Sequence, residues 1–221
     1  MIQVGIIGGA GYTAGELIRL LIFHKNAEIN FVYSTSNAGN PVSLIHQDLE
    51  GSISLKFTHV INPNIDVLFL CLGHGNSKKF LKENTFSNKT KIIDLGNDFR
   101  LTKDSVFENK SFIYGLPELN KEKIKGANYI ANPGCFATAI QLALLPLAQE
   151  GILENDIHVN AVTGATGAGT SLSETTHFTW RDNNFSYYKP FTHQHLGEIN
   201  QSLKQLQNGF NKEVLFMPNR G

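Results

Sequence analysis

The sequence predicts an α/β protein in which a doubly wound, Rossmann-type parallel sheet is followed by a second, α+β domain. Three observations support this prediction. The chain opens with a nearly continuous apolar run, residues 2–7, which is typical of a strand buried on both faces of a parallel sheet. Glycines close this run in GGAGYTAG, and a helical pattern follows directly. Further apolar runs then alternate with amphipathic stretches, as in βαβ units.

The first part of the chain contains five apolar runs of strand length. The expected strands are residues 2–7, 28–34, 66–73, 91–96 and 127–134. Helices are expected after the first strand, where Leu17, Leu20 and Leu21 fall on one face, and after the third, in NSKKFLKEN. Pro133 stops the last strand, because proline cannot continue the ladder.

The second part begins with a strongly apolar helix over residues 135–151, in which Pro146 is expected to kink or end the regular portion. The next expected elements are a strand over 157–164, a Gly/Thr/Ser-rich loop over 163–173, a helix over 195–206 and a strand over 212–218. The composition changes near residue 134. We therefore expect two domains, residues 1–134 and residues 135–221.

The composition excludes several classes of partner. Lys plus Arg and Asp plus Glu are both 19, so the net charge is zero, which argues against nucleic acid or an anionic membrane surface. No apolar run is long enough for a membrane helix, and no secretory signal opens the chain. Two cysteines cannot build a disulfide framework or a four-cysteine zinc site. We therefore expect a cytoplasmic protein without a metal.

The glycine turn after the first strand predicts a dinucleotide site. Gly8, Gly9 and Gly11 let the backbone approach a pyrophosphate, and the helix that begins at Tyr12 and Thr13 supplies amide donors and a positive dipole. The spacing is G-x-x-G-x-x-A rather than G-x-G-x-x-G, and no P-loop is present. The alternative is a turn that only connects a strand to a helix.

The end of the second strand favours NADP over NAD. An NAD site places a carboxylate there for the ribose hydroxyls, but this strand ends in Ser34, Thr35 and Ser36. Their hydroxyls can bond a 2′-phosphate. The alternative is that these residues only form a turn.

Cys135 is the candidate nucleophile. It follows Asn132-Pro133-Gly134 and opens an apolar helix, where the dipole and the unpaired amides favour a thiolate and can hold an oxyanion. Cysteines are more often small buried hydrophobes, and we expect that role for Cys71, which lies between leucines in a strand.

A thiolate needs a partner that moves protons, and H-x-H-x-x-E supplies candidates. His193 and His195 precede a helix on which Glu198 could orient one imidazole. The spacing also resembles a zinc site, but further ligands are missing. Arg100 and Arg181 could bind an acidic substrate or form ordinary surface ion pairs.

A Gly/Thr-rich loop could also hold an anion. Gly164 and Gly167 lie in this loop, whose main-chain amides could form a concave anion site; the alternative is a flexible connection.

Several motifs together resemble the N-acetyl-γ-glutamyl-phosphate reductase family, which is related to aspartate-semialdehyde dehydrogenase. In order, they are GGAGYTAGEL, DVLFLCLGHG, IIDLGNDFRL, YGLPELN, NPGCFATA, TGATGAGT and HQHLGEI. The resemblance implies NADPH-dependent reduction of an acyl phosphate to an aldehyde through a cysteine thioester, in arginine biosynthesis. It places the nucleophile on Cys135 and the acid/base on the H-x-H element, where we favour His195. The remaining expected substrate residues are Arg100, Asn132, Gly164, Gly167 and Arg181.

The sequence also departs from the family pattern. Gly197 stands where the family has proline, Gln194 where it commonly has arginine, and Asn37 where an arginine often follows the second strand. Family members are longer, so we expect a C-terminally truncated second domain. A homo-oligomer is expected. Two alternatives stay open, a related acyl-phosphate reductase such as aspartate-semialdehyde dehydrogenase and an inactive NADP-binding fragment. Retention of both Cys135 and His195 argues against the fragment.

Overall fold

The structure, a computed structural model, describes all 221 residues and divides into two compact units. The first comprises Met1–Gly115 with Asn120–Asn132, and the second comprises Leu116–Leu119 with Pro133–Gly221. None of the helices is both long enough and apolar enough to cross a membrane.

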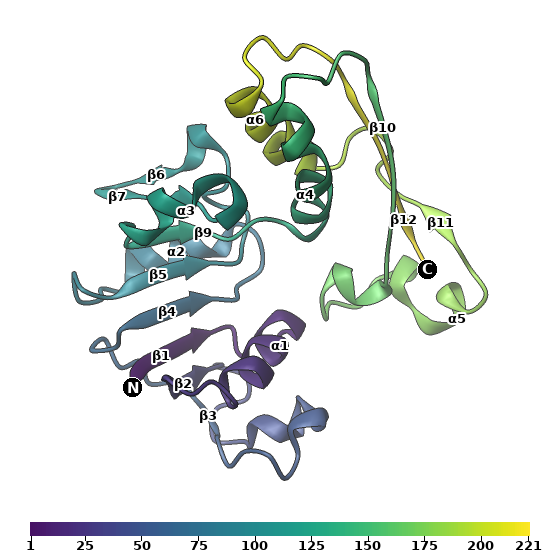
Figure 1. The fold of residues 1–221 in the computed structure, drawn as a ribbon. Helices are drawn as coiled ribbons and strands as arrows, with labels where there is room; N and C mark the ends of the chain where they lie inside the picture. The colour runs from purple at the N-terminus through teal and green to yellow at the C-terminus, as the bar shows by residue number, and fades with distance from the viewer. The chain divides into compact units, whose positions relative to one another are not determined.

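The first unit is built on a seven-stranded, fully parallel sheet with the order β3-β2-β1-β4-β5-β9-β8 (Figure 1). Its strands are β1 (Ile2–Ile7), β2 (Ala27–Tyr33), β3 (Phe57–Thr58), β4 (Val67–Leu70), β5 (Lys91–Asp94), β8 (Ile113–Tyr114) and β9 (Tyr129–Ala131). Because β1 lies between β2 and β4, the strand order reverses there, and a ligand crevice usually lies beyond the carboxyl ends of such strands. The predicted fold class is confirmed.

Both faces of this sheet are buried, each by its own apolar cluster. The main helices are α1 (Tyr12–Leu21) and α2 (Asn76–Glu83). Ile6 of β1 packs in a cluster with Ile18 of α1, whereas Ile7 packs in the other cluster with Leu81 of α2. Successive side chains alternate across a strand, so burial on both faces requires the continuous apolar run that opens the sequence.

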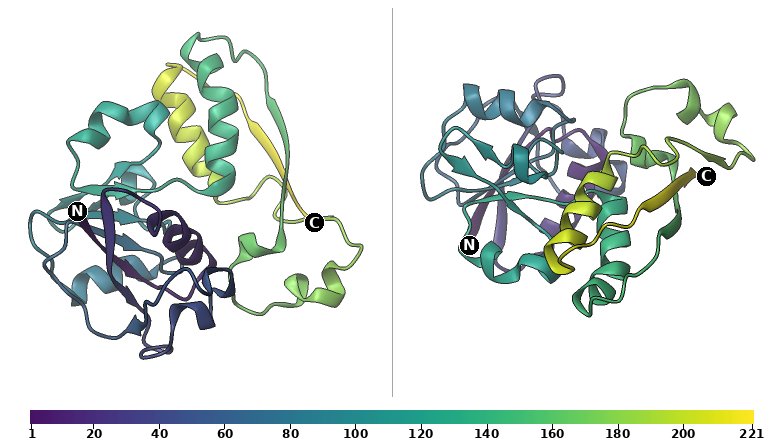
Figure 2. Two further views of the ribbon diagram at one scale, coloured as in Figure 1. Left: turned by 60° about the horizontal axis from the view of Figure 1, so that its bottom comes forward. Right: turned by 90° about the horizontal axis from the view of Figure 1, so that it is seen from above.

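The second unit packs two helices beside a small sheet. Helix α4 (Cys135–Gln149) contacts α6 (His195–Leu206), and Figure 2 shows them side by side. The sheet has the order β10-β12-β11, with β10 (Ile157–Thr163) parallel and β11 (Ser186–Tyr187) antiparallel to β12 (Val214–Arg220). The expected helix over 195–206 is confirmed.

One of the two outcomes expected for Pro146, that it ends the regular part of the helix, is wrong. Pro146 does not end helix α4, which continues to Gln149. A proline removes one intrahelical donor, the one that would bond the carbonyl of Leu142. Leu142 is exposed, so water can replace that bond and the helix tolerates the proline.

The other elements are short. They are η1 (Val42–Leu44), η2 (Gln47–Leu49), η3 (Thr102–Asp104), β6 (Val106–Phe107), β7 (Lys110–Ser111), α3 (Pro117–Lys125), η4 (Ala165–Ala168), η5 (Glu174–Thr176) and α5 (Phe178–Arg181). Helix α3 contains a non-helical residue, Asn120, and so consists of two pieces joined at a kink.

Candidate active site

Cys135 is the first residue of helix α4 and is exposed. Gly134 is the N-cap, and the first helical bond runs from the Thr138 amide to the Gly134 carbonyl at 2.8 Å. The amides of the first turn before Thr138 therefore have no acceptor within the helix and are available to an oxyanion. Cys71 differs, because burial, and then the nearby Asp94, raises the pKa of its thiol to about 12.

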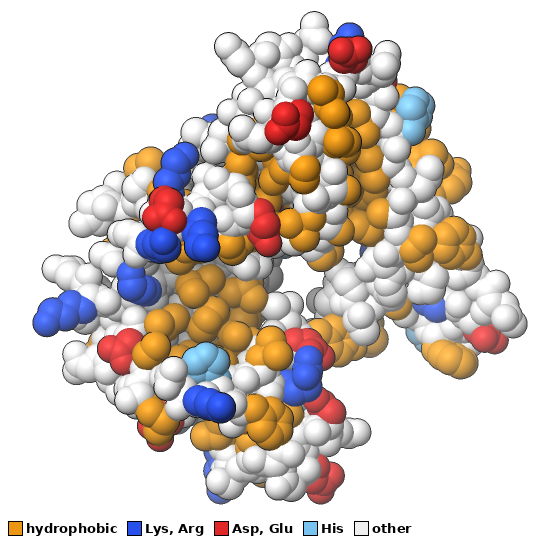
Figure 3. Space-filling model, in the orientation of Figure 1, with side chains coloured by type: hydrophobic (Ala, Val, Ile, Leu, Met, Phe, Trp, Pro, Cys, Tyr) orange, Lys and Arg blue, Asp and Glu red, His pale blue; other side chains and the backbone are white.

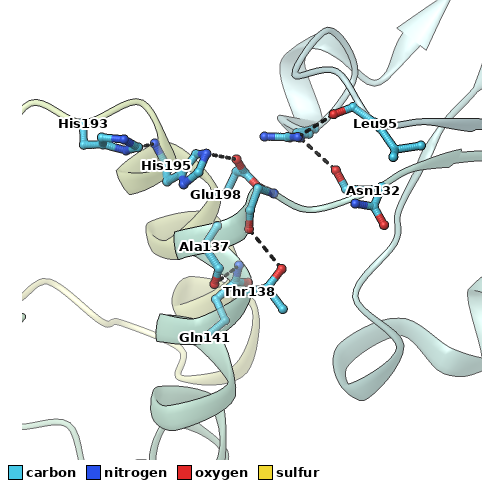
Figure 4. A network of polar contacts seen from close by, with 10 residues as sticks. Leu95, Asn132, Ala137, Thr138, Gln141, His193, His195 and Glu198 are labelled. Carbon is cyan, nitrogen blue, oxygen red and sulfur yellow. Dashed lines mark hydrogen bonds and ion pairs between the residues drawn. The ribbon is translucent and has the colours of Figure 1, made fainter. Parts of the chain in front are cut away.

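His195 lies directly against the residue that precedes the cysteine. A side chain built on Gly134 would overlap the His195 imidazole, so only glycine fits beside this ring. Glu198 holds both residues: its Oε2 accepts a hydrogen bond from the Gly134 amide at 2.9 Å, and its Oε1 lies 4.0 Å from His195 Nε2 (Figure 4). Both His195 and Glu198 are buried. The carboxylate thus ties the imidazole to the start of the cysteine helix.

His193 occupies a different environment from His195. Its Nδ1 accepts a hydrogen bond from the His195 main-chain amide at 3.2 Å, so in the neutral ring the hydrogen is on Nε2. Aromatic rings of Phe136, Tyr188 and Phe216 lie around it, with centroids 5.4–5.7 Å away. Burial is the main cause that lowers the pKa of His193 to about 4, and the charge of His195 adds to it. His193 is therefore neutral at ordinary pH.

Tyr188 and Arg220 also belong to this site, although the sequence analysis did not single them out. The Arg220 guanidinium lies over the Tyr188 ring, with its Cζ 4.3 Å from the centroid, and its Nε is buried without a hydrogen-bond partner. Burial raises the pKa of Tyr188, Arg220 opposes that rise, and a negative charge on Cys135 adds to it. Tyr188 and the thiol therefore lie close enough to interact electrostatically.

Arg181, an expected substrate residue, has other partners in the structure. Its Nη1 donates to the Arg220 carbonyl at 2.8 Å and its Nη2 to the Ser186 hydroxyl at 2.9 Å. These bonds fasten β11 to the end of β12. Within the second unit, Arg220 rather than Arg181 places its guanidinium over the ring of Tyr188, and that ring packs against His193.

The expected anion loop uses some of its amides internally. The Gly167 amide donates to the Gly164 carbonyl at 3.2 Å, and the Gly169 amide to the Thr166 carbonyl at 3.0 Å. These two amides are engaged within the one-turn helix η4, and binding of an anion by the other amides of the loop stays a prediction.

Arg100 and Asn132 lie in the first unit. Arg100 is almost fully buried, and it donates from Nε to the Asn132 carbonyl at 2.8 Å and from Nη2 to the Leu95 carbonyl at 2.9 Å. These bonds connect the chain after β5 to the chain after β9. Asn132 itself is exposed.

The glycine turn has the conformation and the space that a dinucleotide needs. Gly8 has φ +78°, and a side chain there would come within 2.5 Å of the Cys71 carbonyl oxygen. Gly11 caps α1, and a Cβ there would meet only the Gly8 carbonyl, at 3.6 Å. Tyr12 and Thr13, the first residues of α1, are exposed, and their amides have no intrahelical acceptor. The turn therefore fits a pyrophosphate at the helix N-terminus.

The hydroxyl groups after β2 are arranged by Asn37. Its side-chain amide donates to the Ser34 hydroxyl at 3.2 Å and to the Ser36 hydroxyl at 3.1 Å. Ser34 is buried, whereas Thr35 and Ser36 are exposed. Ser36 is thus the better placed of the two bonded serines to meet a ligand.

The structure contains no group of three or more His, Cys, Asp or Glu side chains that could hold a metal ion.

Comparison with protein families matches both parts of the chain. Residues 3–127 match the NAD binding domain of semialdehyde dehydrogenase, and residues 135–221 match the semialdehyde dehydrogenase dimerisation domain.

Curated relatives match along the whole chain and are named N-acetyl-gamma-glutamyl-phosphate reductase. The protein of Flavobacterium johnsoniae is 68% identical over 221 residues, and that of Christiangramia forsetii is 66% identical over 221 residues. Each match covers 100% of this chain and 68% of the relative. The relatives are therefore longer than this chain, as expected.

Solved structures share the fold at low sequence identity. Aspartate semialdehyde dehydrogenase II from Vibrio cholerae superposes with a TM-score of 0.70 at 15% identity, covering 100% of this chain and 70% of that one. Aspartate semialdehyde dehydrogenase from Candida albicans, solved with NADP, superposes with a TM-score of 0.66 at 17% identity. This match covers 100% of this chain and 67% of that one. These structural matches show the fold, and the curated relatives and the family models show that the chain belongs to the N-acetyl-gamma-glutamyl-phosphate reductase family of the semialdehyde dehydrogenases.

Proposed function

We propose that this chain carries the residues for NADPH-dependent reduction of N-acetyl-γ-glutamyl phosphate to N-acetylglutamate semialdehyde, with release of phosphate, in arginine biosynthesis. The observation that carries the proposal is the linkage of Cys135, His195 and Glu198 through Gly134. A nucleophile at a helix N-terminus, an imidazole packed beside it and a carboxylate that orients the imidazole form the constellation that covalent acyl transfer needs. The names of the relatives supply the substrate.

The first chemical step forms a thioester. The Cys135 thiolate attacks the γ-carbonyl carbon, a sulfur–carbon bond forms, and the carbonyl oxygen takes the negative charge. The unpaired amides of the first turn of α4 stabilise this oxyanion. When the adduct collapses, the bond from the carbon to the phosphate oxygen breaks and phosphate leaves with the electron pair.

The second part of the reaction returns the enzyme to its starting form. NADPH, when bound, supplies the hydride that reduces the thioester carbon to the aldehyde level. The protonated His195 gives its proton to the oxyanion that hydride addition leaves on the thiohemiacetal, and the neutral imidazole takes the same proton back while the sulfur–carbon bond breaks, so that the aldehyde leaves and the Cys135 thiolate and the imidazolium are both restored. Glu198 stabilises the imidazolium that forms.

The glycine turn and the serines after β2 are the proposed cofactor residues. Gly8 and Gly11 would give the pyrophosphate room, and the amides of Tyr12 and Thr13 would donate hydrogen bonds to it. Ser34 and Ser36 follow β2, where the 2′-phosphate would be bound, and residues 33–37 contain no carboxylate that would repel it. These residues favour NADP over NAD.

The second unit is the proposed surface for association with another copy of the chain. Its family model is described as a dimerisation domain. The segment 172–191 exposes a series of large hydrophobic side chains, and Figure 3 shows hydrophobic side chains at the surface of this unit. The exposed residues are Leu172, Phe178, Trp180, Phe185, Tyr187 and Phe191. A second copy would cover them in a homo-oligomer. We place this enzyme in the cytoplasm, where a thiol nucleophile stays reduced.

A direct assay tests the proposed function. The protein is incubated with N-acetylglutamate semialdehyde, phosphate and NADP, and formation of NADPH is followed by absorbance. The proposal predicts activity that requires phosphate and is lost in Cys135→Ser. Activity with aspartate semialdehyde in place of the acetylated substrate would instead support the related aspartate enzyme.

A further inference from the structure

Gly15 is a glycine in a place where helix physics disfavours glycine. It lies in the interior of α1 and is buried, and it is absent from the residues with positive φ. A glycine inside a helix lowers its stability relative to alanine, so a reason for it must come from packing. A Cβ at this position would lie 2.5 Å from Nδ1 and 2.8 Å from Cε1 of His46. The His46 ring occupies the space of the missing side chain.

The other side of the same ring is bonded to the glycine turn. His46 Nε2 lies 2.7 Å from the Gly9 carbonyl oxygen. A carbonyl oxygen can only accept, so Nε2 carries the hydrogen and donates it. The Gly9 amide meanwhile donates to the Tyr33 carbonyl at the end of β2, at 2.9 Å. Both polar main-chain groups of Gly9 are therefore fixed, one by the sheet and one by His46.

His46 is held in place although it lies between two one-turn helices. Val42 and Leu49, one from each of these helices, are buried in the cluster that also contains Ile18 of α1. The His46 amide donates to the Val42 carbonyl, and the Leu49 amide donates to the His46 carbonyl, both at 3.0 Å. The ring is thus positioned by the apolar core, and only 7% of the residue is exposed.

We infer that His46 and Gly15 form a lock on the glycine turn, in which His46 is a positioning residue for the dinucleotide. The ring packs on α1 at Gly15 and bonds the turn at Gly9, so it fixes the turn relative to the helix whose first amides meet the pyrophosphate. The inference rests on the proposed nucleotide role of this turn. Without the lock the turn samples other conformations, and nucleotide binding has to restore the competent one.

The first experiment measures the dissociation constant for NADPH in matched variants. His46→Phe keeps a ring but removes the donor, and we expect it to weaken NADPH binding about ten-fold, the usual scale for leaving one buried acceptor unpaired. His46→Gln, whose amide nitrogen can reach the Nε2 position, should recover most of that loss. His59→Ala, a change at an exposed histidine, is the control and should be silent. Equal affinities for wild type and His46→Phe would overturn the inference.

A double-mutant cycle tests the contact without nucleotide. Gly15→Ala should lower the urea midpoint in the wild type, because its methyl group collides with the ring. In the His46→Ala background the same change should raise the midpoint, since the space is open and alanine favours the helix. Additive effects would show that ring and glycine do not interact and would overturn the lock.

The two experiments separate the possible failures. A wild-type protein that does not bind NADPH would contradict the proposed function and the positioning role together, while the cycle would still report on the contact. Normal NADPH binding with an additive cycle would contradict the lock alone.

Discussion

The His195 imidazole occupies the space that a side chain at Gly134 would need, so the proposed acid/base packs on the residue next to the proposed nucleophile. Glu198 reinforces the contact from α6, through its hydrogen bond to the Gly134 amide and its approach to the imidazole.

This contact makes Gly134→Ala the sharpest test of the arrangement. The added methyl group must displace the imidazole, and overpacking of this kind costs about 1–3 kcal/mol of stability. We expect kcat to fall about a hundred-fold, as for loss of a general acid/base, while iodoacetamide still labels Cys135. Gly126→Ala, at a glycine with nothing within 4 Å of a Cβ, is the control and should keep full activity. Unchanged kcat in Gly134→Ala would show that the imidazole is not needed there.

Two substitutions of Glu198 separate its charge from its hydrogen bond. Glu198→Gln keeps an oxygen for the Gly134 amide but loses the charge beside His195. Glu198→Ala loses both and leaves the amide unpaired. We therefore expect a modest loss of kcat for Gln and a larger one for Ala, together with a lower urea midpoint for Ala only. Equal loss in both variants would indicate that the charge alone matters.

The pKa of His193 predicts a pH dependence of stability. Burial lowers it from the ordinary value of 6.5 to about 4, so between these values the unfolded chain binds a proton that the folded protein does not. The free energy of unfolding must therefore fall as pH decreases from 6.5 to 4. Asp94 acts in the opposite direction, since burial raises its pKa to about 6 and the folded protein holds that proton until the pH rises through 6.

The two contributions are separated by substitution. In His193→Gln, whose side chain does not titrate, the decrease in the urea midpoint between pH 7 and pH 5 should be smaller than in the wild type. His59→Ala, which removes an exposed histidine, is the control. The same pH dependence in wild type and His193→Gln would mean that the ring accepts a proton freely in the folded state.

Ser36 offers a test of cofactor preference. The wild type should bind NADPH more tightly than NADH. Ser36→Asp adds a negative charge at an exposed position near the expected 2′-phosphate, so we expect NADPH binding to weaken about ten-fold while NADH binding is kept or improved. Ser36→Asn, of the same size without the charge, is the control. Equal affinity of the wild type for both cofactors would contradict the assignment.

Local sequence signals predicted the elements that depend on local physics. The buried strand, glycine turn and helix at the N-terminus are adjacent in sequence, and so are the NPGC turn and α4. The hairpin β6–β7 and helix α3 were not predicted, because they are short and charged. Asn120 breaks α3 with non-helical angles and bonds the Tyr114 carbonyl instead.

The contacts that define the site could not be predicted in the same way. Gly134 and His195 meet only because α4 and α6 pack together, and no local pattern encodes that meeting. The sequence likewise could not tell whether Arg181 or Arg220 belongs to the site. In the structure the Arg181 guanidinium bonds the Arg220 carbonyl, whereas the Arg220 guanidinium lies over the Tyr188 ring. Gly15 carried a usable signal, since a glycine inside an amphipathic helix implies a neighbour that fills its space.

The central claim is that Cys135 carries the acyl group, and mass spectrometry of the intermediate tests it most directly. The protein is mixed with N-acetyl-γ-glutamyl phosphate without nucleotide, quenched in acid, digested and sequenced. The account predicts an N-acetylglutamyl adduct on the peptide that contains Cys135, released by hydroxylamine and absent in Cys135→Ser. An adduct on another residue, or an equal adduct in the Cys135→Ser protein, would contradict it.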